Sequence, residues 1–217
     1  MHSLSQAAAA IGSLNTLTVR PDGKIAADNT DWIGIRNLIE DALARREGRT
    51  DNSTLTSVVM GAGGTARAAC YALQQMGIGN RYIFNRSGSK AVALGSEFGA
   101  TALPSIDSGP LLSIRLDIVV SCVPGSAEIT LPRSVLAAKP IVLDAAYRPR
   151  LTPLLGDARA AGCEVIEGIE MLYEQGCAQC NVWTHRPAPR GSIARGLAAF
   201  MEGQDCGPLP SRLTREL

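Results

Sequence analysis

The sequence predicts an α/β protein built on a doubly wound parallel sheet, with a smaller and different unit ahead of it. From Ser57 onward, strands of about four or five apolar residues alternate with helical stretches of about ten residues or more, which is the pattern of parallel sheets covered by helices. A glycine-rich loop stands where the first of these strands gives way to a helix. Before Ser57 a strong turn signal separates two short extended stretches, so this part is expected to fold differently.

The composition is that of a globular protein and argues against several classes. The chain has 217 residues and a mass of 22.8 kDa, with 46% hydrophobic residues, 19% charged residues and a formal net charge of +1. Lysine and arginine are scattered along it, so we expect no direct nucleic-acid binding. No apolar run approaches the roughly 20 residues that span a bilayer, and the first residues lack the features of a secretory signal. We therefore expect a cytoplasmic protein with no membrane partner.

The cysteines are expected to be free thiols, and no metal site is expected. The sequence contains six cysteines, and inside a cell buried cysteine behaves mostly as a small hydrophobic residue. Cys177 and Cys180 have the spacing of a redox motif or half of a zinc site, but there is no second pair. His2 and His185 do not supply the spacing of metal ligands either.

Residues 1–50 are expected to form the small unit. Leu14–Val19 and Lys24–Ala27 are extended stretches on either side of a Pro-Asp-Gly turn, which predicts a hairpin. A helix is expected from Asp31 to about Arg46, because apolar residues recur there at helical spacing. The polar stretch that follows ends this helix and marks the domain boundary.

Residues 51–201 are expected to form the alternating α/β domain. Its expected strands are Ser57–Met60, Arg81–Phe84, Asp117–Ser121, Ile141–Asp144 and Glu164–Ile166. Its expected helices are Thr65–Met76, Ser89–Phe98, Thr152–Ala161, Gly168–Ala178 and a last one that ends near Met201. The tail, residues 202–217, contains glycine, proline and alternating charges, and we expect it to be disordered.

The first chemical motif is the glycine-rich loop. Gly61, Gly63 and Ala66 occupy the fixed positions of the pattern G-x-G-x-x-G/A, Gly64 and Thr65 lie between them, and the flanking strand and helix are both expected. Glycines permit a tight turn and the close approach of a pyrophosphate, whose charge is met by free N–H groups at the helix N-terminus. The motif therefore favours a dinucleotide site over a turn that only packs helix against strand.

The residues after the second strand of the alternating domain indicate which dinucleotide is bound. A carboxylate about 20 residues after the loop would bind the ribose hydroxyl of NAD, but the sequence has Asn85, Arg86, Ser87 and Lys90 in this region. A guanidinium, an ammonium and hydroxyls suit a 2′-phosphate, so we expect NADP. The alternative is that Arg86 and Lys90 are solvated charges at a helix start, where a cation is unfavourable unless it meets an anion.

Three separated parts of the sequence resemble the shikimate dehydrogenase family. They are Ile11–Thr16 with Asp28–Asp31, the loop GAGGTARAA with NRSGSK, and Gly168–Gly176. The resemblance covers residues 5 to about 190 and extends to two fungal forms, the shikimate dehydrogenase domain of AROM polypeptides and the quinate repressor derived from them. It implies an NADP-binding Rossmann domain, with residues 1–50 as a remnant of the substrate domain, and hydride transfer between shikimate and the nicotinamide.

The resemblance also implies roles for individual residues. Asn15, Tyr147 and Gln175 would bind the substrate, and Asp31 would be one member of a catalytic Lys–Asp pair. Ser121, Cys122 and Val123 would pass under the cofactor, and Gly168 would approach the nicotinamide.

The lysine of that pair has no match in this sequence. In the family it lies upstream of the asparagine that Asn15 matches, whereas Lys24 lies in the expected hairpin turn and Lys90 and Lys139 lie in the cofactor domain. We therefore expect no turnover of shikimate or 3-dehydroshikimate by this chain alone. The alternative is a non-catalytic module that senses quinate or shikimate, which would be nuclear if it belongs to a repressor. Other domains of a multidomain polypeptide are possible partners.

Each substrate-side residue also has a purely structural interpretation. Asp31 follows Asn29 and Thr30, and all three are good helix caps. Asn15 fits a turn or a strand edge, and Gln175 fits an exposed helix position. From the residues alone, these interpretations stay open beside the functional ones.

Overall fold

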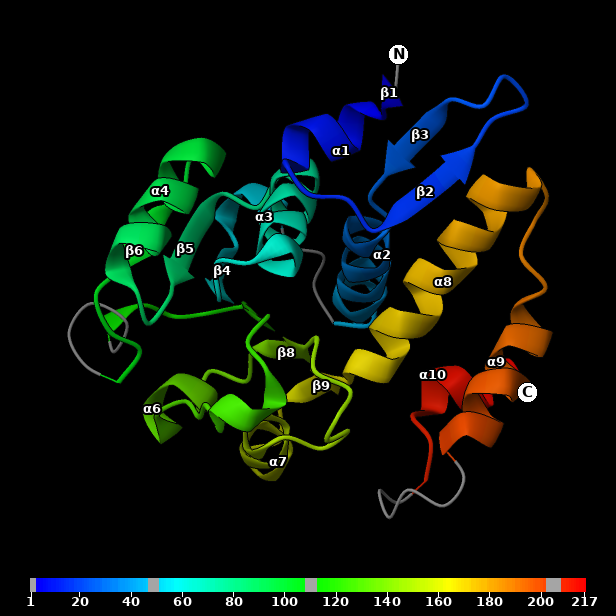
Figure 1. Ribbon diagram of the computed structural model, residues 1–217. Helices are drawn as coiled ribbons and strands as arrows, with labels where there is room; N and C mark the ends of the chain where they lie inside the picture. Colours follow the sequence, from blue (N-terminus) through cyan, green and yellow to red (C-terminus); the bar gives the residue numbers. More distant parts are fainter. Residues whose placement is uncertain (1–2, 47–50, 108–112, 202–207) are drawn as a thin grey trace.

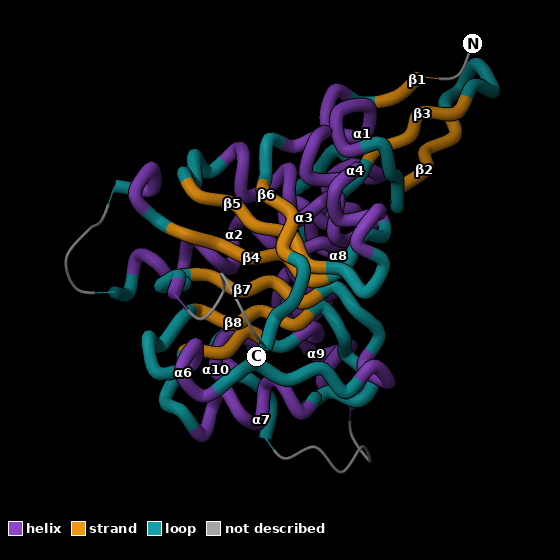
Figure 2. Tube along the Cα trace, turned by 90° about the vertical axis from the view of Figure 1, so that its left-hand side faces the viewer, coloured by secondary structure: helices purple, strands orange, loops and turns teal. Residues whose placement is uncertain are grey.

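Two sheets of different size organise the molecule (Figure 1). The computed structural model describes residues 3–46, 51–107, 113–201 and 208–217. A three-stranded sheet near the N-terminus lies at the opposite end of the molecule from helices α6 (Arg133–Leu136) and α7 (Pro153–Ala160), as Figures 1 and 2 show. Within the described part of the chain, no helix is long and apolar enough to cross a membrane.

The small sheet contains the expected hairpin. Its strands are β1 (Ser3–Leu4), β2 (Thr16–Val19) and β3 (Ile25–Asp28), in the order β1-β3-β2, with β2 antiparallel and β1 parallel to β3. Helix α1 (Gln6–Ile11), which the sequence pattern did not predict, lies between β1 and β2. It begins at Ser5, whose hydroxyl accepts a hydrogen bond from the Ala8 N–H at 3.0 Å, and it ends at Gly12.

Helix α2 (Asp31–Ala44) leads from the small sheet into the large domain. Ile35, Leu38, Ile39 and Ala42 are buried at helical spacing, and they pack in the same core as helix α3 and one face of the large sheet. A short 3-10 turn, η1 (Asn52–Thr54), then precedes the first strand of that sheet.

The large sheet is parallel throughout its six described strands, which confirms the predicted fold class. Its strands are β4 (Thr56–Met60), β5 (Asn80–Phe84), β6 (Thr101–Leu103), β7 (Ile118–Ser121), β8 (Ile141–Asp144) and β9 (Glu164–Ile166), in the order β6-β5-β4-β7-β8-β9. The chain starts at the centre with β4 and winds outward in both directions, so a crevice opens beside β4 and β7 where the strand order reverses. Only the edge strand β6 was not expected.

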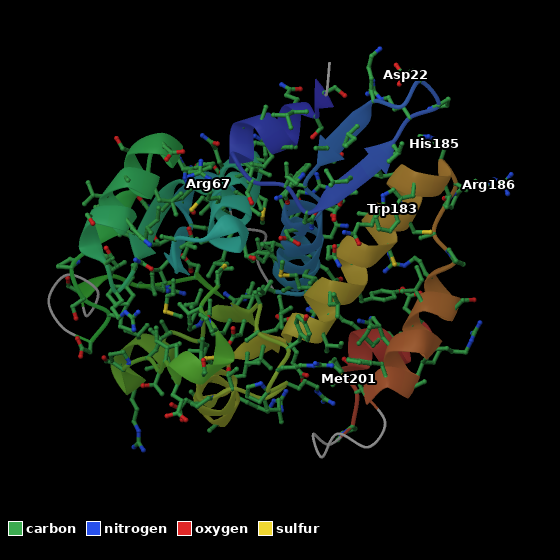
Figure 3. All side chains as sticks on the ribbon, in the orientation of Figure 1. Asp22, Arg67, Trp183, His185, Arg186 and Met201 are labelled. Atoms are coloured by element: carbon green, nitrogen blue, oxygen red, sulfur yellow. The ribbon has the colours of Figure 1, made fainter. Side chains whose placement is uncertain are left out.

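Helices cover both faces of this sheet. Further helices are α3 (Gly64–Gln75), α4 (Gly88–Phe98), α8 (Gly168–Thr184) and α9 (Arg190–Met201), with a 3-10 turn η2 (Gly125–Ala127). Helices α2, α3 and α4 cover one face of the sheet and α6 and α7 the other, whereas α9 packs on α8. Val59 faces the core under α2, α3 and α4, whereas its neighbour Val58 faces the core under α6 and α7. The end of α8 reaches the small sheet, where the indole N–H of Trp183 donates to the main-chain oxygen of Leu17 at 3.0 Å (Figure 3).

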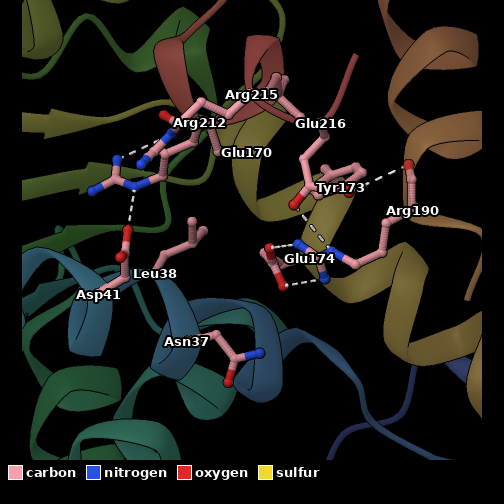
Figure 4. A pocket seen from close by; sticks show the side chains of 11 residues that line it. Asn37, Leu38, Asp41, Glu170, Tyr173, Glu174, Arg190, Arg212, Arg215 and Glu216 are labelled. Carbon is pink, nitrogen blue, oxygen red and sulfur yellow. Dashed lines mark hydrogen bonds and ion pairs between the residues drawn. The ribbon is translucent and has the colours of Figure 1, made fainter. Parts of the chain in front are cut away.

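The end of the chain differs from the disordered tail that we expected over residues 202–217. Residues 202–207 lie outside the described residues, but α10 (Ser211–Thr214) packs against α8 with Leu213 only 2% exposed. Arg212 forms ion pairs with carboxylates of α2, β9 and α8, which are Asp41, Glu164 and Glu170 (Figure 4). These contacts are far apart in sequence, so local composition did not reveal them.

Candidate active site

Three segments far apart in the sequence bring polar side chains together beside the large sheet. The Asn15 side-chain N–H₂ donates to the Asp31 carboxylate at 2.8 Å and to the Thr30 hydroxyl at 3.1 Å, and it lies 3.5 Å from the Gln175 side-chain oxygen. Thr30 also donates to that oxygen at 3.1 Å. The structure therefore brings Asn15, Asp31 and Gln175 together, as the resemblance implied.

The start of α2 fixes the orientation of Asp31. Thr30 occupies the N-cap position without a side-chain cap hydrogen bond, and Asp31 is the first residue of the helix rather than its cap. The Asp31 main-chain N–H donates to the side chain of Asn29 at 3.0 Å, while Asn29 in turn donates to the main-chain oxygen of Ser13 at 3.1 Å. Asn29 thus fixes the main chain at the start of α2, while the Asp31 carboxylate accepts its hydrogen bond from Asn15.

Burial and hydrogen bonding act in opposite directions on the Asp31 carboxyl. Burial raises its pKa above the ordinary value, and the hydrogen bond from Asn15 partly offsets that rise. A carboxylate with a raised pKa exchanges protons more readily near neutral pH than an exposed one does. The position thus suits a group that accepts a hydrogen bond or a proton from a hydroxyl.

Helix α8 delivers Gln175 through an unusually close contact with α2. A Cβ atom added at Gly34 would lie 3.2 Å from both the Gln175 main-chain nitrogen and the Met171 main-chain oxygen. The Gln175 N–H₂ donates to the Leu172 main-chain oxygen at 3.1 Å, so its own side-chain oxygen is directed to Thr30 and Asn15. The absence of a side chain at Gly34 therefore sets how near Gln175 comes to the cluster.

The glycine-rich loop has the shape that a bound pyrophosphate requires. Gly61 has φ +121°, a conformation that side chains disfavour, and a Cβ there would lie 3.1 Å from the Cys122 main-chain oxygen. At Gly63, by contrast, no protein atom lies within 4 Å of an added Cβ, so the space beside it is open. Gly64 begins α3 with no side-chain cap, and Ala66 is buried against the sheet. The open space thus lies next to uncapped helix N–H groups.

The predicted 2′-phosphate residues border that same space. A pocket of about 230 Å³ is lined by Ala62, Gly63, Asn85, Arg86, Ser87 and Lys90. Arg86 and Lys90 are exposed, and neither forms an ion pair with another described residue. Two cations without anionic partners beside a pyrophosphate-sized space fit a ligand that carries a further phosphate.

The other expected cofactor residues extend the same cleft along the carboxyl ends of the strands. Val123 lines both a pocket of about 740 Å³ beside Asn85 and another of about 490 Å³ that contains Thr65, Cys122 and Tyr147. Ser121 is the last residue of β7, and its side chain is fully buried. The 740 Å³ pocket shares Val123 with the 490 Å³ pocket and Asn85 with the 230 Å³ pocket, so the three adjoin one another in a row.

Gly168 and Tyr147 lie at the end of the cleft near β8 and α8. A Cβ at Gly168 would lie 2.6 Å from the Ala145 main-chain oxygen, so α8 begins against the loop after β8. Tyr147 lines the pocket in that loop and is 39% exposed. Among the described residues, no hydrogen bond joins Tyr147 to the cluster of Asn15 and Asp31.

Sequence reasoning treated Thr30 only as a possible cap and did not include Thr16. Both are almost fully buried, and Thr16 donates to the Asn15 side-chain oxygen at 2.7 Å. That oxygen also accepts the Thr30 main-chain N–H at 2.9 Å, so the orientation of the Asn15 amide is fixed from both sides. The only signal in the sequence was the run of polar residues directly before an apolar helix.

No group of three His, Cys, Asp or Glu side chains suited to a metal ion occurs among the residues that the structure describes. The cysteines within those residues are free thiols. The polar groups that the cluster presents are one carboxylate, side-chain amides and hydroxyls.

The parallel sheet, the glycine-rich loop and the pockets at the carboxyl ends of the strands define a Rossmann-type protein, and a smaller three-stranded sheet precedes its large domain. No protein-family model matches the chain. It is 37% identical over 199 residues to the pentafunctional AROM polypeptide of Komagataella phaffii, which covers 85% of this chain but only 12% of that polypeptide.

Solved structures give matches over most of both chains. The shikimate dehydrogenase of Mycobacterium tuberculosis is 32% identical, with a TM-score of 0.75 over 92% of this chain and 73% of that one. The shikimate 5-dehydrogenase of Thermus thermophilus, solved in complex with NADP(H) and shikimate, is 26% identical, with a TM-score of 0.75 over 91% and 72%. The chain belongs to the shikimate dehydrogenase family.

Proposed function

We propose that this chain binds NADP and a shikimate-like cyclic alcohol and forms part of an NADP-dependent shikimate dehydrogenase. The observation that carries the proposal is the convergence of Asn15, Asp31 and Gln175 in a protein with a cleft shaped for a phosphorylated dinucleotide. The related protein solved with NADP(H) and shikimate supports both ligands. Because the chain spans 12% of the AROM polypeptide, other domains of such a polypeptide are proposed partners.

The proposed work divides between two ends of the site, which are the nucleotide pockets and the cluster of Asn15, Asp31 and Gln175. The uncapped first turn of α3 would meet the pyrophosphate, and Arg86 with Lys90 would meet the 2′-phosphate. When bound, NADP supplies the acceptor or donor of a hydride. At the other end, the amides of Asn15 and Gln175 would orient substrate hydroxyls, and the Asp31 carboxylate would accept a hydrogen bond from the reacting hydroxyl.

We infer that binding is the activity to measure first. Lys24 pairs with Asp22 at the hairpin turn, Lys90 stands in the proposed 2′-phosphate site, and Lys139 lies beside Gly162. Within the residues that the structure describes, no hydrogen bond or ion pair joins any of these lysines to Asp31. Among the described residues, no lysine contacts Asp31, so the experiments that follow measure ligand binding rather than turnover.

Calorimetry with NADP⁺ and NAD⁺ tests the cofactor half of the proposal. We expect NADP⁺ to bind more tightly than NAD⁺, and Arg86→Ala to weaken NADP⁺ binding by about tenfold, since an exposed charge-assisted hydrogen bond contributes on the order of 1.4 kcal/mol. NAD⁺ binding should hardly change. Arg186→Ala, a change of an exposed arginine far from the cleft (Figure 3), is the matched control. Equal affinities for the two nucleotides in the unmodified chain would contradict the NADP assignment.

Calorimetry with shikimate in the presence of NADP⁺ tests the substrate half. We expect a binding signal that Asp31→Asn weakens, because asparagine keeps the size of the side chain but replaces an oxygen acceptor with N–H₂. Glu40→Gln, at an exposed position of the same helix, is the control. If shikimate binds equally well to the chain and to Asp31→Asn, the assignment of the substrate site is wrong.

A further inference from the structure

Arg67 connects the helix of the glycine-rich loop to the segment that carries Asn15. It lies in the first turns of α3 and extends to α1 (Figure 3), where its Nε donates to the Ile11 main-chain oxygen at 2.5 Å. The other side of its guanidinium forms an ion pair with Glu97 of α4, and its carbon centre lies 5.5 Å above the Phe98 ring. One side chain of α3 thus contacts two other helices, α1 and α4, and only one of its contacts is to an exposed charge.

The segment from Ile11 to Asn15 is fitted closely around this arginine. A Cβ at Gly12 would lie 2.6 Å from an Arg67 nitrogen, so a side chain there would force the guanidinium to shift, and Gly12 has φ +67°, which side chains disfavour. The Ile11 oxygen is one of the last carbonyls of α1, and Arg67 supplies a donor that the helix end lacks. The position of the chain after α1 is therefore set from α3.

The same segment touches both halves of the proposed site. The Ser13 hydroxyl lies where a Cβ on Gly64, the first residue of α3, would come within 2.6 Å of it. Two residues later, Asn15 donates its main-chain N–H to the Asp28 oxygen at 3.1 Å and its side chain to the Asp31 carboxylate at 2.8 Å. Ile11, which Arg67 contacts, thus lies four positions before Asn15, whose side-chain amide contacts the Asp31 carboxylate.

We propose that Arg67 is a positioning residue, which holds residues 11–15 against the first turn of α3 so that Asn15 stays in hydrogen-bond contact with Asp31. Helix α3, which follows the glycine-rich loop, then holds the nucleotide end and the Asn15–Asp31 end of the site in a fixed relative position. The functional meaning of this contact rests on the proposed function, because that proposal gives Asn15 and Asp31 their roles. The contact itself can be tested in the chain without any ligand.

The decisive measurement is the pKa of the Asp31 carboxyl. Carbon NMR measures it in the unmodified chain and in Arg67→Met. Methionine keeps the apolar stem but removes every donor. Because the Asn15 hydrogen bond lowers the pKa of Asp31, loosening Asn15 should raise that pKa further. Amide hydrogen exchange at Asn15 should also accelerate by about tenfold, as expected when one hydrogen bond to a charged donor is lost. Arg67→Lys, which keeps the charge beside Glu97 without the fork of donors, should give a smaller rise.

Arg81→Met separates positioning from general stability. Arg81 also donates to main-chain oxygens, those of Ile78 and Phe98, at 2.6 and 3.3 Å, but it lies at the start of β5, away from the cluster. We expect it to lower the free energy of unfolding without changing the pKa of Asp31. If Arg67→Met does not fold, Arg67→Lys still decides the question. An unchanged Asp31 pKa in the folded Arg67 variants would overturn the inference, whereas failure to bind NADP⁺ would overturn only the proposed function.

Discussion

Replacing Gly34 with alanine would separate the two helices that place Asp31 and Gln175. Gly34 lies one turn into α2, where α8 crosses it, and the added methyl would stand 3.2 Å from the main-chain nitrogen of Gln175 and from the main-chain oxygen of Met171. Ordinary van der Waals contact requires a few tenths of an ångström more. Both neighbours are main-chain atoms of a long helix, so α8 must move as a unit to make room.

The magnitude is the difference between two known effects. Alanine is favoured over glycine inside a helix by about 1 kcal/mol, which by itself would stabilise the protein. Overpacking by one methyl against unyielding neighbours costs about 1–3 kcal/mol. We therefore expect Gly34→Ala to lower the free energy of unfolding by about 0–2 kcal/mol, because the packing cost at a helix crossing exceeds the propensity gain.

Gly176→Ala supplies the comparison that removes helix propensity from the measurement. Gly176 follows Gln175 on α8, and no atom lies within 4 Å of a Cβ added there, so this variant should gain about 1 kcal/mol. Urea unfolding of both variants measures the contrast, which should be about 1–3 kcal/mol in favour of Gly176→Ala. Equal stabilisation by the two changes would show that the close contact at Gly34 does not hold α8 in place, and the argument for Gln175 would fail with it.

Three other predictions concern substitutions of buried charged residues and of a helix N-cap. Arg150→Met removes the buried cation of Glu167 and leaves only the partly exposed Arg159 beside that carboxylate, so it should cost about 1–3 kcal/mol in urea unfolding. An unchanged free energy of unfolding would contradict the pairing. Burial raises the pKa of Glu170 to about 7 despite its ion pair with Arg212, so below this pH the folded state holds a proton that the unfolded state has lost. The free energy of unfolding should therefore fall as pH rises from about 5 to 7, and Glu170→Gln should remove that slope; parallel pH profiles of the two proteins would refute this. Thr152→Ala removes the N-cap of α7 and the hydrogen bond to Asp144, and thermal unfolding should show a loss of about 1–3 kcal/mol, whereas an unchanged midpoint would contradict both roles.

The parallel sheet could be predicted because its signals are local. Each strand from β4 to β9, apart from β6, is a short apolar run bounded by turn residues, and the crossovers are long enough for helices. β1 and β6 were missed because two or three residues carry no periodicity, and their pairing depends on β3 and β5. Helix α10 was missed for a related reason. Its stability comes from a buried leucine and from ion pairs with residues far away in the sequence.

The candidate site was predictable to different degrees at its two ends. The nucleotide loop is contiguous, so its glycines and the cations after β5 could be predicted from motif spacing. At the substrate end, Asn15 and Gln175 are 160 residues apart, and only the family resemblance linked them. Thr30 could not be found in this way, since its buried hydroxyl has meaning only after α8 is in place. The close contacts at Gly34 and Gly12 likewise depend on how helices cross, which no local pattern reports.

Packing assigns Asp31 to the large domain rather than to the small sheet that precedes it. Ile35 and Ile39 are fully buried in the core that α2 shares with α3 and α8, so the start of α2 is fixed to the helices that carry the nucleotide loop and Gln175. Asn15, by contrast, precedes β2 and is exposed. A displacement of the small sheet would therefore separate Asn15 from Asp31 and leave Asp31 in place, and the hydrogen bond between these two residues is the contact that depends on how the small unit sits.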